Sequence, residues 1–134
     1  HYLVSNSIDI SQFKNFVYDV SNYEDINDLY IISDMLITDY SSVFFDYANL
    51  KRPILFFMYD LEEYKNNIRD FYLDLNELPG PIVENEKDLI KNIRNIKDIS
   101  KKYHDIYIKF NNKYNYLDNG EVTAKVVKEC INWN

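Results

Sequence analysis

The side chains best suited to chemistry lie in one polar segment, Thr38-Asp39-Tyr40-Ser41-Ser42, and at Asp46. Hydroxyls and free backbone N–H groups at the start of a helix bind anions, because the positive end of the helix points at the ligand. Asp46 follows Ser42 by about one helical turn, so both would share a face. The pattern indicates a phosphate site. N-capping by Ser42 and a solvated carboxylate at Asp46 would explain the same residues without a ligand.

These residues need a strand before them and a helix after them. Residues 35–37 have the length and composition of a buried strand. From Val43 onward, Phe44, Tyr47 and Ala48 recur at helical spacing and would cover one face. The segment is therefore predicted to be a strand–turn–helix unit, with the polar cluster at the carboxyl end of the strand.

The rest of the chain alternates expected strands and helices. Strands are predicted at residues 2–4, 16–20, 54–58 and 82–83, and helices at 26–33, 61–68, 86–96, 100–110 and 122–133, the last with Val122, Val126, Val127 and Ile131 on its inner face. The run 54–58 has no polar alternation, which is typical of a parallel strand covered on both faces. This order predicts an α/β fold, with a Rossmann-like parallel sheet flanked by helices.

Ligands of open parallel sheets bind outside the carboxyl ends of the strands. Three polar loops follow predicted strands here, at residues 19–24, 38–42 and 59–60. If their strands are neighbours, these loops form one rim.

Composition excludes several classes of site and partner. The net charge of -7 argues against binding nucleic acid by charge. The single Cys130 excludes an internal disulfide and a cysteine-based zinc site. No apolar run approaches the ~20 residues of a membrane span, and no signal peptide is expected.

The length of 134 residues fits one domain or part of one. The chain lacks an initiator Met and begins at His1 with what looks like the end of a strand. We therefore expect residues 1–134 to be one domain, truncated on its N-terminal side, from a longer protein.

The stretch from Ile32 to Asp46 resembles the signature of the CDP-glycerol glycerophosphotransferases, the family of the teichoic acid polymerases and primases. Further matching motifs follow in the family's order over nearly the whole chain: HY at 1–2, VYDVS at 17–21, LKRP at 50–53, YDLEEY at 59–64, RDFY at 69–72, LPGP at 78–81 and YLDNG at 116–120.

The resemblance implies a GT-B architecture, with this chain forming most of the carboxy-terminal domain that holds the nucleotide donor. The family transfers glycerol phosphate from CDP-glycerol to a growing poly(glycerol phosphate) chain and releases CMP. Some members use CDP-ribitol, and related ones build capsule polymers. The resemblance also implies a bacterial protein peripheral to the cytoplasmic face of the membrane. Its lipid-linked polymer acceptor, its membrane contacts and its general base would lie mostly outside this chain.

The resemblance assigns roles to the residues of the polar segment. Ser41 and Ser42, with their backbone N–H groups, would hold the pyrophosphate, and Asp46 would bind ribose hydroxyls. His1 would contact the phosphates as a catalytic residue, because a protonated imidazole stabilises developing negative charge. Its alternative is an exposed terminal residue without a role. No metal or other cofactor is expected, since enzymes of this architecture generally neutralise that charge with amides, hydroxyls and basic side chains.

Three further residues complete the expected donor site. Thr38 begins the polar segment and is placed with the donor-binding residues. Asp39 would repel a pyrophosphate, so we expect it to accept hydrogen bonds from backbone N–H groups or to bind glycerol hydroxyls. Arg69 would pair with a phosphate, and a surface ion pair is its alternative.

Two alternatives from other classes remain open. The chain could belong to a GT-B glycosyltransferase that uses a UDP-sugar, or to a non-catalytic nucleotide-binding module. The sequence leaves open the alditol of the donor, the acceptor, and primase or polymerase behaviour.

Overall fold

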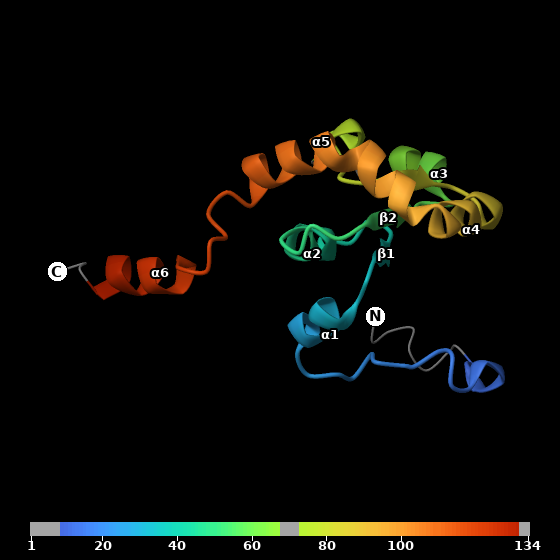
Figure 1. Cartoon of the computed structure of the whole chain (residues 1–134), viewed down its shortest axis with the longest axis horizontal. Helices are drawn as coiled ribbons and strands as arrows, with labels where there is room; N and C mark the ends of the chain where they lie inside the picture. Colours follow the sequence, from blue (N-terminus) through green and yellow to red (C-terminus); the bar gives the residue numbers. More distant parts are fainter. Residues whose placement is uncertain (1–8, 68–72, 132–134) are drawn as a thin grey trace. The chain divides into compact units, whose positions relative to one another are not determined.

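A computed structural model describes residues 9–67 and 73–131. The chain divides into two compact units, residues 1–32 and 33–134. Figure 1 shows the order of the helices and strands along the chain. None of the helices in the described ranges is both long and apolar enough to cross a bilayer.

The first unit contains two short helices, η2 (Ser11–Phe13) and α1 (Ile26–Ile32). The helix predicted at 26–33 is confirmed. It begins directly after Asp25, whose carboxylate accepts a hydrogen bond from the N–H of Asn27 at 2.8 Å. This is the way a capping carboxylate satisfies a free amide at a helix start.

The strand predicted at residues 16–20 is wrong. No residue there is in a strand, and the side chains of Phe16 and Tyr18 are 84% and 71% exposed. Asp19 instead accepts a hydrogen bond from the N–H of Ser21 at 2.9 Å, within a turn. β-prone residues form a strand only where a partner strand and a packing surface are available. The prediction rested on propensity alone, and these residues are exposed instead. The strand predicted at 2–4 lies outside the described residues.

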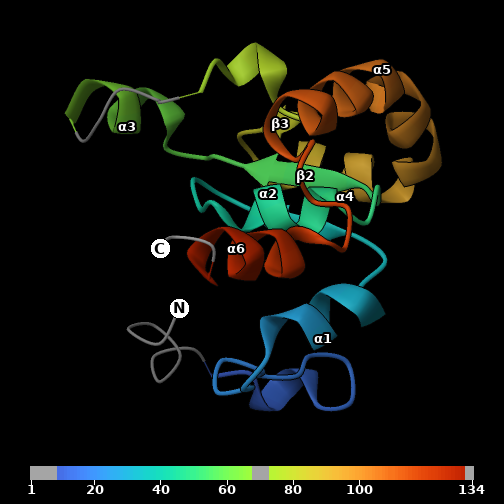
Figure 2. The ribbon, with the colours of Figure 1, turned by 90° about the vertical axis from the view of Figure 1, so that its left-hand side faces the viewer.

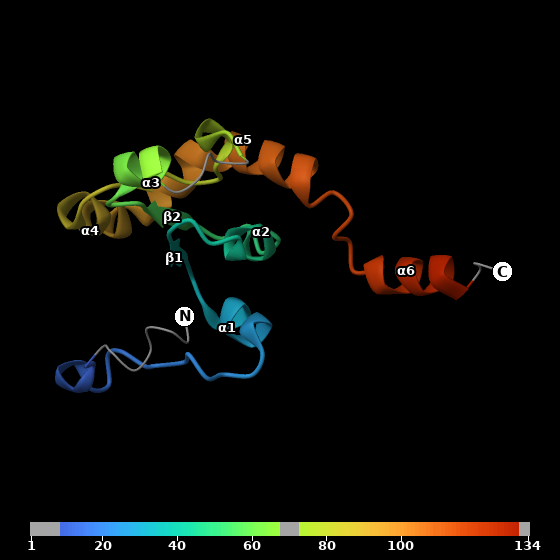
Figure 3. The same ribbon diagram turned by 180° about the vertical axis from the view of Figure 1, so that it is seen from behind.

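The second unit is built on a parallel sheet of three strands in the order β1-β2-β3. Figure 3 labels the neighbouring strands β1 and β2. The strands are β1 (Leu36–Thr38), β2 (Ile54–Phe57) and β3 (Ile82–Val83). Ile37 pairs with Leu55, and Phe56 pairs with Ile82. The first three residues of β2 are buried, which confirms the prediction of a strand covered on both faces.

Helices connect and flank these strands, as predicted. They are α2 (Val43–Ala48), α3 (Leu61–Asn67), η3 (Leu75–Glu77), α4 (Glu86–Arg94), α5 (Ile96–Tyr114) and α6 (Val122–Ile131). The helix α5 extends beyond the predicted 100–110 at both ends, because only Asn95 separates it from α4 and no glycine or proline interrupts the chain there. The face of α6 predicted to be inner is exposed, with Val126 at 55% and Ile131 at 69%.

Aromatic side chains from α2, β2 and α5 form the core beside β2. Figure 2 shows the ribbons of these three elements. Phe44 of α2 meets Phe56 of β2 edge-on at 5.1 Å between ring centroids, and it lies 5.7 Å from Phe110 of α5. The fully buried Tyr47 donates a hydrogen bond from its hydroxyl to the carbonyl of Ser33 at 3.0 Å. These contacts fix α2, and so fix the end of the loop that precedes it.

A close approach of two backbones also needs a glycine in this sheet. A Cβ atom on Gly80 would overlap the carbonyl oxygen of Ile54. The residue next to Gly80 starts the pairing of β3 with β2, where the N–H of Phe56 donates to the carbonyl of Pro81 at 3.0 Å. Only glycine allows the chain to pass at this distance.

Candidate functional site

Two of the three expected polar loops lie at the same edge of the sheet. Thr38 is the last residue of β1 and pairs in register with Phe56 of the neighbouring β2. Because the strands are parallel, the loop 39–42 and the loop 58–60 both leave from the carboxyl edge, where ligands bind in such folds. The third expected loop, 19–24, belongs to the first unit.

A side-chain contact joins these two loops. The hydroxyl of Tyr40 donates a hydrogen bond of 2.8 Å to Oδ1 of Asp60, and the contact is partly buried. The Tyr40 ring stacks on the ring of Tyr64, in the first turn of α3, with centroids 3.7 Å apart and planes inclined by 11°. Burial, and then the bond to Asp60, raise the pKa of Tyr40, so its phenol remains a protonated donor at neutral pH.

Sequence reasoning gave Tyr40 and Asp60 no specific role. Both residues were recognised as parts of polar loops, but they are 20 positions apart. No local pattern pairs a tyrosine with a carboxylate at that separation. The adjacency of the strands before the two loops is the signal that could have suggested the contact.

Asp39 has the first of its two expected roles. Its Oδ1 accepts a hydrogen bond from the N–H of Ser41 at 3.1 Å, which shapes the loop. The same bond occupies the Ser41 amide, which was expected to face a phosphate. The hydroxyl of Ser41 is then the group of this residue that remains for a ligand.

Ser42 occupies the N-cap position of α2 but does not cap it with its side chain. Its φ and ψ are -70° and -4°, and the hydroxyl makes no capping hydrogen bond. Capping therefore does not explain this serine. Because α2 has only six residues, the loop hydroxyls rather than a long helix would provide the contacts to an anion.

Two of the four remaining expected residues lie on the same strand–loop–helix unit. Asp46 is exposed in the first turn of α2, and Thr38 is half-buried at the end of β1. His1 and Arg69 lie outside the described residues. The structure thus brings Thr38, Asp39, Ser41, Ser42 and Asp46 onto one strand–loop–helix unit.

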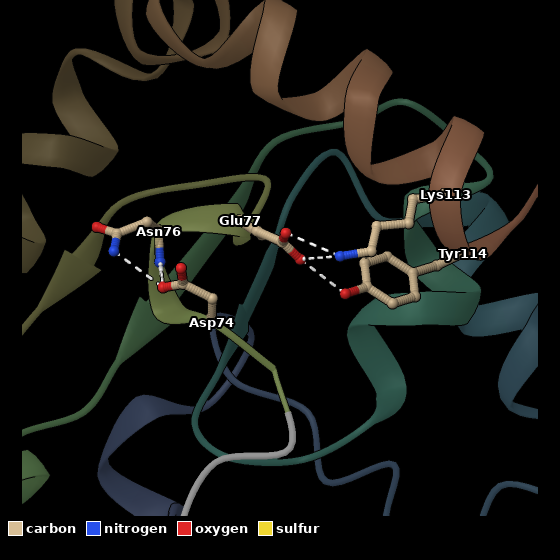
Figure 4. Close-up of polar contacts among 5 residues, drawn as sticks. All are labelled: Asp74, Asn76, Glu77, Lys113 and Tyr114. Atoms are coloured by element: carbon tan, nitrogen blue, oxygen red, sulfur yellow. Dashed lines mark hydrogen bonds and ion pairs between the residues drawn. The ribbon is translucent and has the colours of Figure 1, made fainter.

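A second polar cluster attaches η3 to α5 (Figure 4). Both carboxylate oxygens of Glu77 accept hydrogen bonds from Nζ of Lys113 at 2.8 Å, and Oε2 also accepts one from the hydroxyl of Tyr114 at 2.7 Å. The bond from Lys113, and then that from Tyr114, hold the pKa of Glu77 below its ordinary value. Tyr114 in turn meets Phe45 edge-on at 5.5 Å, so this cluster also supports α2.

A cavity in the second unit does not coincide with the expected site. It has a volume of about 270 Å³ and lies between α5 and the amino-terminal end of β2, with Lys51, Ile54, Tyr103, His104 and Tyr107 in its lining. None of the expected site residues lines it. We place the candidate site at the carboxyl edge of the sheet, because ligands of open parallel sheets bind outside the carboxyl ends of the strands.

No group of three or more metal-binding side chains occurs within residues 9–67 and 73–131. The oxygen-bearing side chains at the carboxyl edge are instead carboxylates and hydroxyls, which hydrogen-bond to sugar hydroxyls and to phosphate oxygens respectively.

Comparison with known proteins gives consistent matches. The family model described as CDP-Glycerol:Poly(glycerophosphate) glycerophosphotransferase matches residues 1–132. The teichoic acid poly(glycerol phosphate) polymerase of Bacillus subtilis (strain 168) is 48% identical over 95% of this chain and 17% of its own length. The teichoic acid glycerol-phosphate transferase of Staphylococcus aureus (strain NCTC 8325 / PS 47) is 47% identical over 94% of this chain and 32% of its own length.

Solved structures match as well. The wall teichoic acid polymerase TagF superposes with a TM-score of 0.85 at 41% identity, over 98% of this chain and 34% of that one. A histidine variant of TagF soaked with CDPG gives a TM-score of 0.87 at 43% identity, over 94% of this chain and 31% of that one. The predicted α/β fold is confirmed, and it matches part of the polymerase structure. The chain spans about a third or less of the length of these relatives.

Proposed function

Because the chain belongs to the CDP-glycerol:poly(glycerophosphate) glycerophosphotransferase family, we propose that it is the donor-binding part of an enzyme that extends a teichoic acid or capsule-type polymer. The enzyme would transfer glycerol phosphate from CDP-glycerol to a growing poly(glycerol phosphate) chain. The observation that carries the proposal is the family match over residues 1–132. The names of the relatives and the CDPG soak of TagF support it.

The reaction sets a clear electrostatic requirement. An acceptor hydroxyl attacks the phosphorus next to glycerol, a new P–O bond forms, and the P–O bond to CMP breaks. CMP leaves with the bonding electron pair, so the site must stabilise the charge that develops on its phosphate. The acceptor proton passes to a general base that is not among the residues assigned here.

The loop 39–42 would meet this requirement with hydroxyl donors. The Ser41 and Ser42 side chains are exposed at the carboxyl edge of the sheet, and the bond from the Ser41 amide to Asp39 fixes the backbone between them. Hydroxyls held in this way can donate to pyrophosphate oxygens without a large reorganisation. We assign the pyrophosphate contacts to these two serines.

The other assignments follow the family resemblance. Asp46 would bind ribose hydroxyls from the first turn of α2, and Thr38 would line the site at the end of β1. Asp39 has a loop-shaping role and could also meet glycerol hydroxyls. His1 and Arg69 would contact phosphate groups.

The wider biology is proposed on the same basis. The donor would be CDP-glycerol or CDP-ribitol, because relatives named for either alditol phosphate match the chain. The acceptor would be a lipid-linked polymer bound through other parts of the full-length protein. The enzyme would work as a peripheral protein at the cytoplasmic face of the bacterial membrane.

Isothermal titration of the full-length protein with CDP-glycerol, CMP and UDP-GlcNAc tests the donor class. We expect heat from both cytidine compounds and none from UDP-GlcNAc. Binding of UDP-GlcNAc alone would contradict the proposal and support a UDP-sugar glycosyltransferase.

Replacement of Ser42 by alanine tests the pyrophosphate assignment. Ser42→Ala should weaken CDP-glycerol binding about tenfold or more, because it removes a hydrogen bond to a charged group. The matched control is Ser100→Ala, since Ser100 is an exposed serine on α5 whose hydroxyl donates to the carbonyl of Ile96. Full transfer activity and unchanged affinity in Ser42→Ala would remove this residue from the site.

A further inference from the structure

We propose that Tyr40 and Asp60, supported by the ring of Tyr64, form a clamp that positions the loop 39–42 for the donor. The inference rests on the proposed function of that loop. It assigns Tyr40 and Asp60 as positioning residues, which act on the donor through the serines and not by touching it.

The clamp begins at Tyr40, in the middle of the loop 39–42. Tyr40 lies between Asp39, which shapes the loop, and Ser41, which is assigned to the pyrophosphate. Its hydroxyl is held by Asp60 at 2.8 Å and its ring is held by Tyr64 at 3.7 Å between centroids. Two restraints on one side chain also restrain the backbone on either side of it.

The clamp ends at Asp60. This residue lies between β2, the central strand of the sheet, and α3, which begins at the next residue. Its carbonyl accepts a hydrogen bond of 2.9 Å from the N–H of Tyr64, and Met58, two residues before it, is buried. The clamp therefore attaches a polar surface loop to a buried strand and to the first turn of a helix.

The clamp changes the conformational entropy that the loop loses when the donor binds. An exposed loop that must be ordered by its ligand loses conformational entropy on binding, and this loss reduces affinity. A loop ordered beforehand avoids that loss and presents its donors in place. The clamp should thus act on donor affinity, with little effect on the stability of the core.

Four variants of the full-length protein test the clamp through CDP-glycerol affinity, the kcat and KM of transfer, and Tm. Tyr40→Phe removes the hydrogen bond and keeps the stacked ring. It should raise the Kd for CDP-glycerol about five- to tenfold and lower kcat/KM at least as much, with Tm nearly unchanged. Asp60→Ala should have the same effect, and the double variant should be no weaker than either single one, because both changes remove one bond.

Asp60→Asn is the conservative variant, since its amide oxygen still accepts a bond from Tyr40. It should restore affinity to within about twofold of the unsubstituted protein. Tyr103→Phe is the matched control, because Tyr103 lies on α5 at the opposite edge of the sheet. This control should leave the Kd and the KM for CDP-glycerol unchanged.

Several results would overturn the clamp. They are an unchanged Kd in Tyr40→Phe, additive effects in the double variant, failure of Asp60→Asn to restore affinity, or a fall in Tm that parallels the loss of affinity. If the unsubstituted protein binds no CDP-glycerol, the proposed function fails, and the clamp fails with it. If it binds and Tyr40→Phe binds equally well, the clamp alone fails.

Discussion

At the scale of single residues, Glu77 shows how a surface side chain can organise a loop. Its carboxylate accepts three hydrogen bonds, from Lys113 and Tyr114, and so joins η3 to α5. The pKa of Glu77 is lowered and that of Lys113 is raised, each chiefly by its hydrogen bond to the other. Both groups are solvent-accessible, so the contribution to stability is that of a surface interaction.

The lowered pKa of Glu77 makes a prediction about pH. A carboxylate with a folded-state pKa below its ordinary 4.5 stabilises the fold above that value, and this stabilisation is lost as the pH falls through the folded-state pKa. Glu77→Gln should therefore lower Tm at neutral pH, and the difference from the unsubstituted chain should shrink on acidification. Melting curves over a pH series measure this. A difference that is constant with pH would show that the charge of Glu77 is not involved.

Residue patterns predicted the candidate site in part. The cluster from Thr38 to Ser42 and its place after a strand could be read directly, because strand length and hydroxyl clustering are local properties. Accepting a hydrogen bond from the Ser41 amide was one of two roles expected for Asp39. The pairing of Tyr40 with Asp60 could not be read, since it depends on which strands are neighbours.

At the scale of elements, burial separates the strand prediction that is confirmed at β2 from the one that is wrong at residues 16–20. Residues 54–57 of the run predicted at 54–58 form the central strand β2, because an unbroken apolar run can be satisfied only by cover on both faces. Residues 16–20 are equally β-prone, yet they lie exposed outside any strand. α5 is longer than predicted, because no glycine or proline stops the helix among the residues added at its two ends.

Gly80 provides a test of close packing within the sheet. Gly80→Ala should lower the free energy of unfolding by about 2 to 3 kcal/mol, because the new Cβ would overlap the carbonyl oxygen of Ile54 and the strands must move apart. Gly120→Ala is the control, since Gly120 has a φ of 79° and no neighbouring atom within 4 Å of a new Cβ. The control should lose about 1 kcal/mol through backbone strain alone. Equal losses in urea unfolding would contradict the packing argument.

At the scale of the whole molecule, charge constrains how an anionic donor binds. The chain carries a net charge of -7, so it does not attract CDP-glycerol over long distances. In the proposed donor site, affinity would then come from short-range contacts, such as the hydrogen bonds assigned to Ser41 and Ser42. This is consistent with a site of hydroxyl groups at the carboxyl edge of the sheet.

Metal removal tests the same view of the donor site. The family resemblance predicts that hydroxyls, amides and basic side chains neutralise the pyrophosphate. Addition of EDTA to the full-length protein should therefore leave the affinity for CDP-glycerol unchanged, and added Mg²⁺ should not increase it. Titrations with and without EDTA make the measurement. Binding that requires Mg²⁺ and disappears with EDTA would show that an ion takes this role.

The stack of Tyr40 on Tyr64 has an optical consequence. Two nearly parallel phenol rings at 3.7 Å couple their electronic transitions, so the pair contributes its own band to the near-ultraviolet circular dichroism. A difference spectrum against Tyr64→Leu would isolate that band from the signals of the other tyrosines among the 13 in the chain. The loop would then carry an intrinsic reporter of the stacked pair, which can be read without any attached dye.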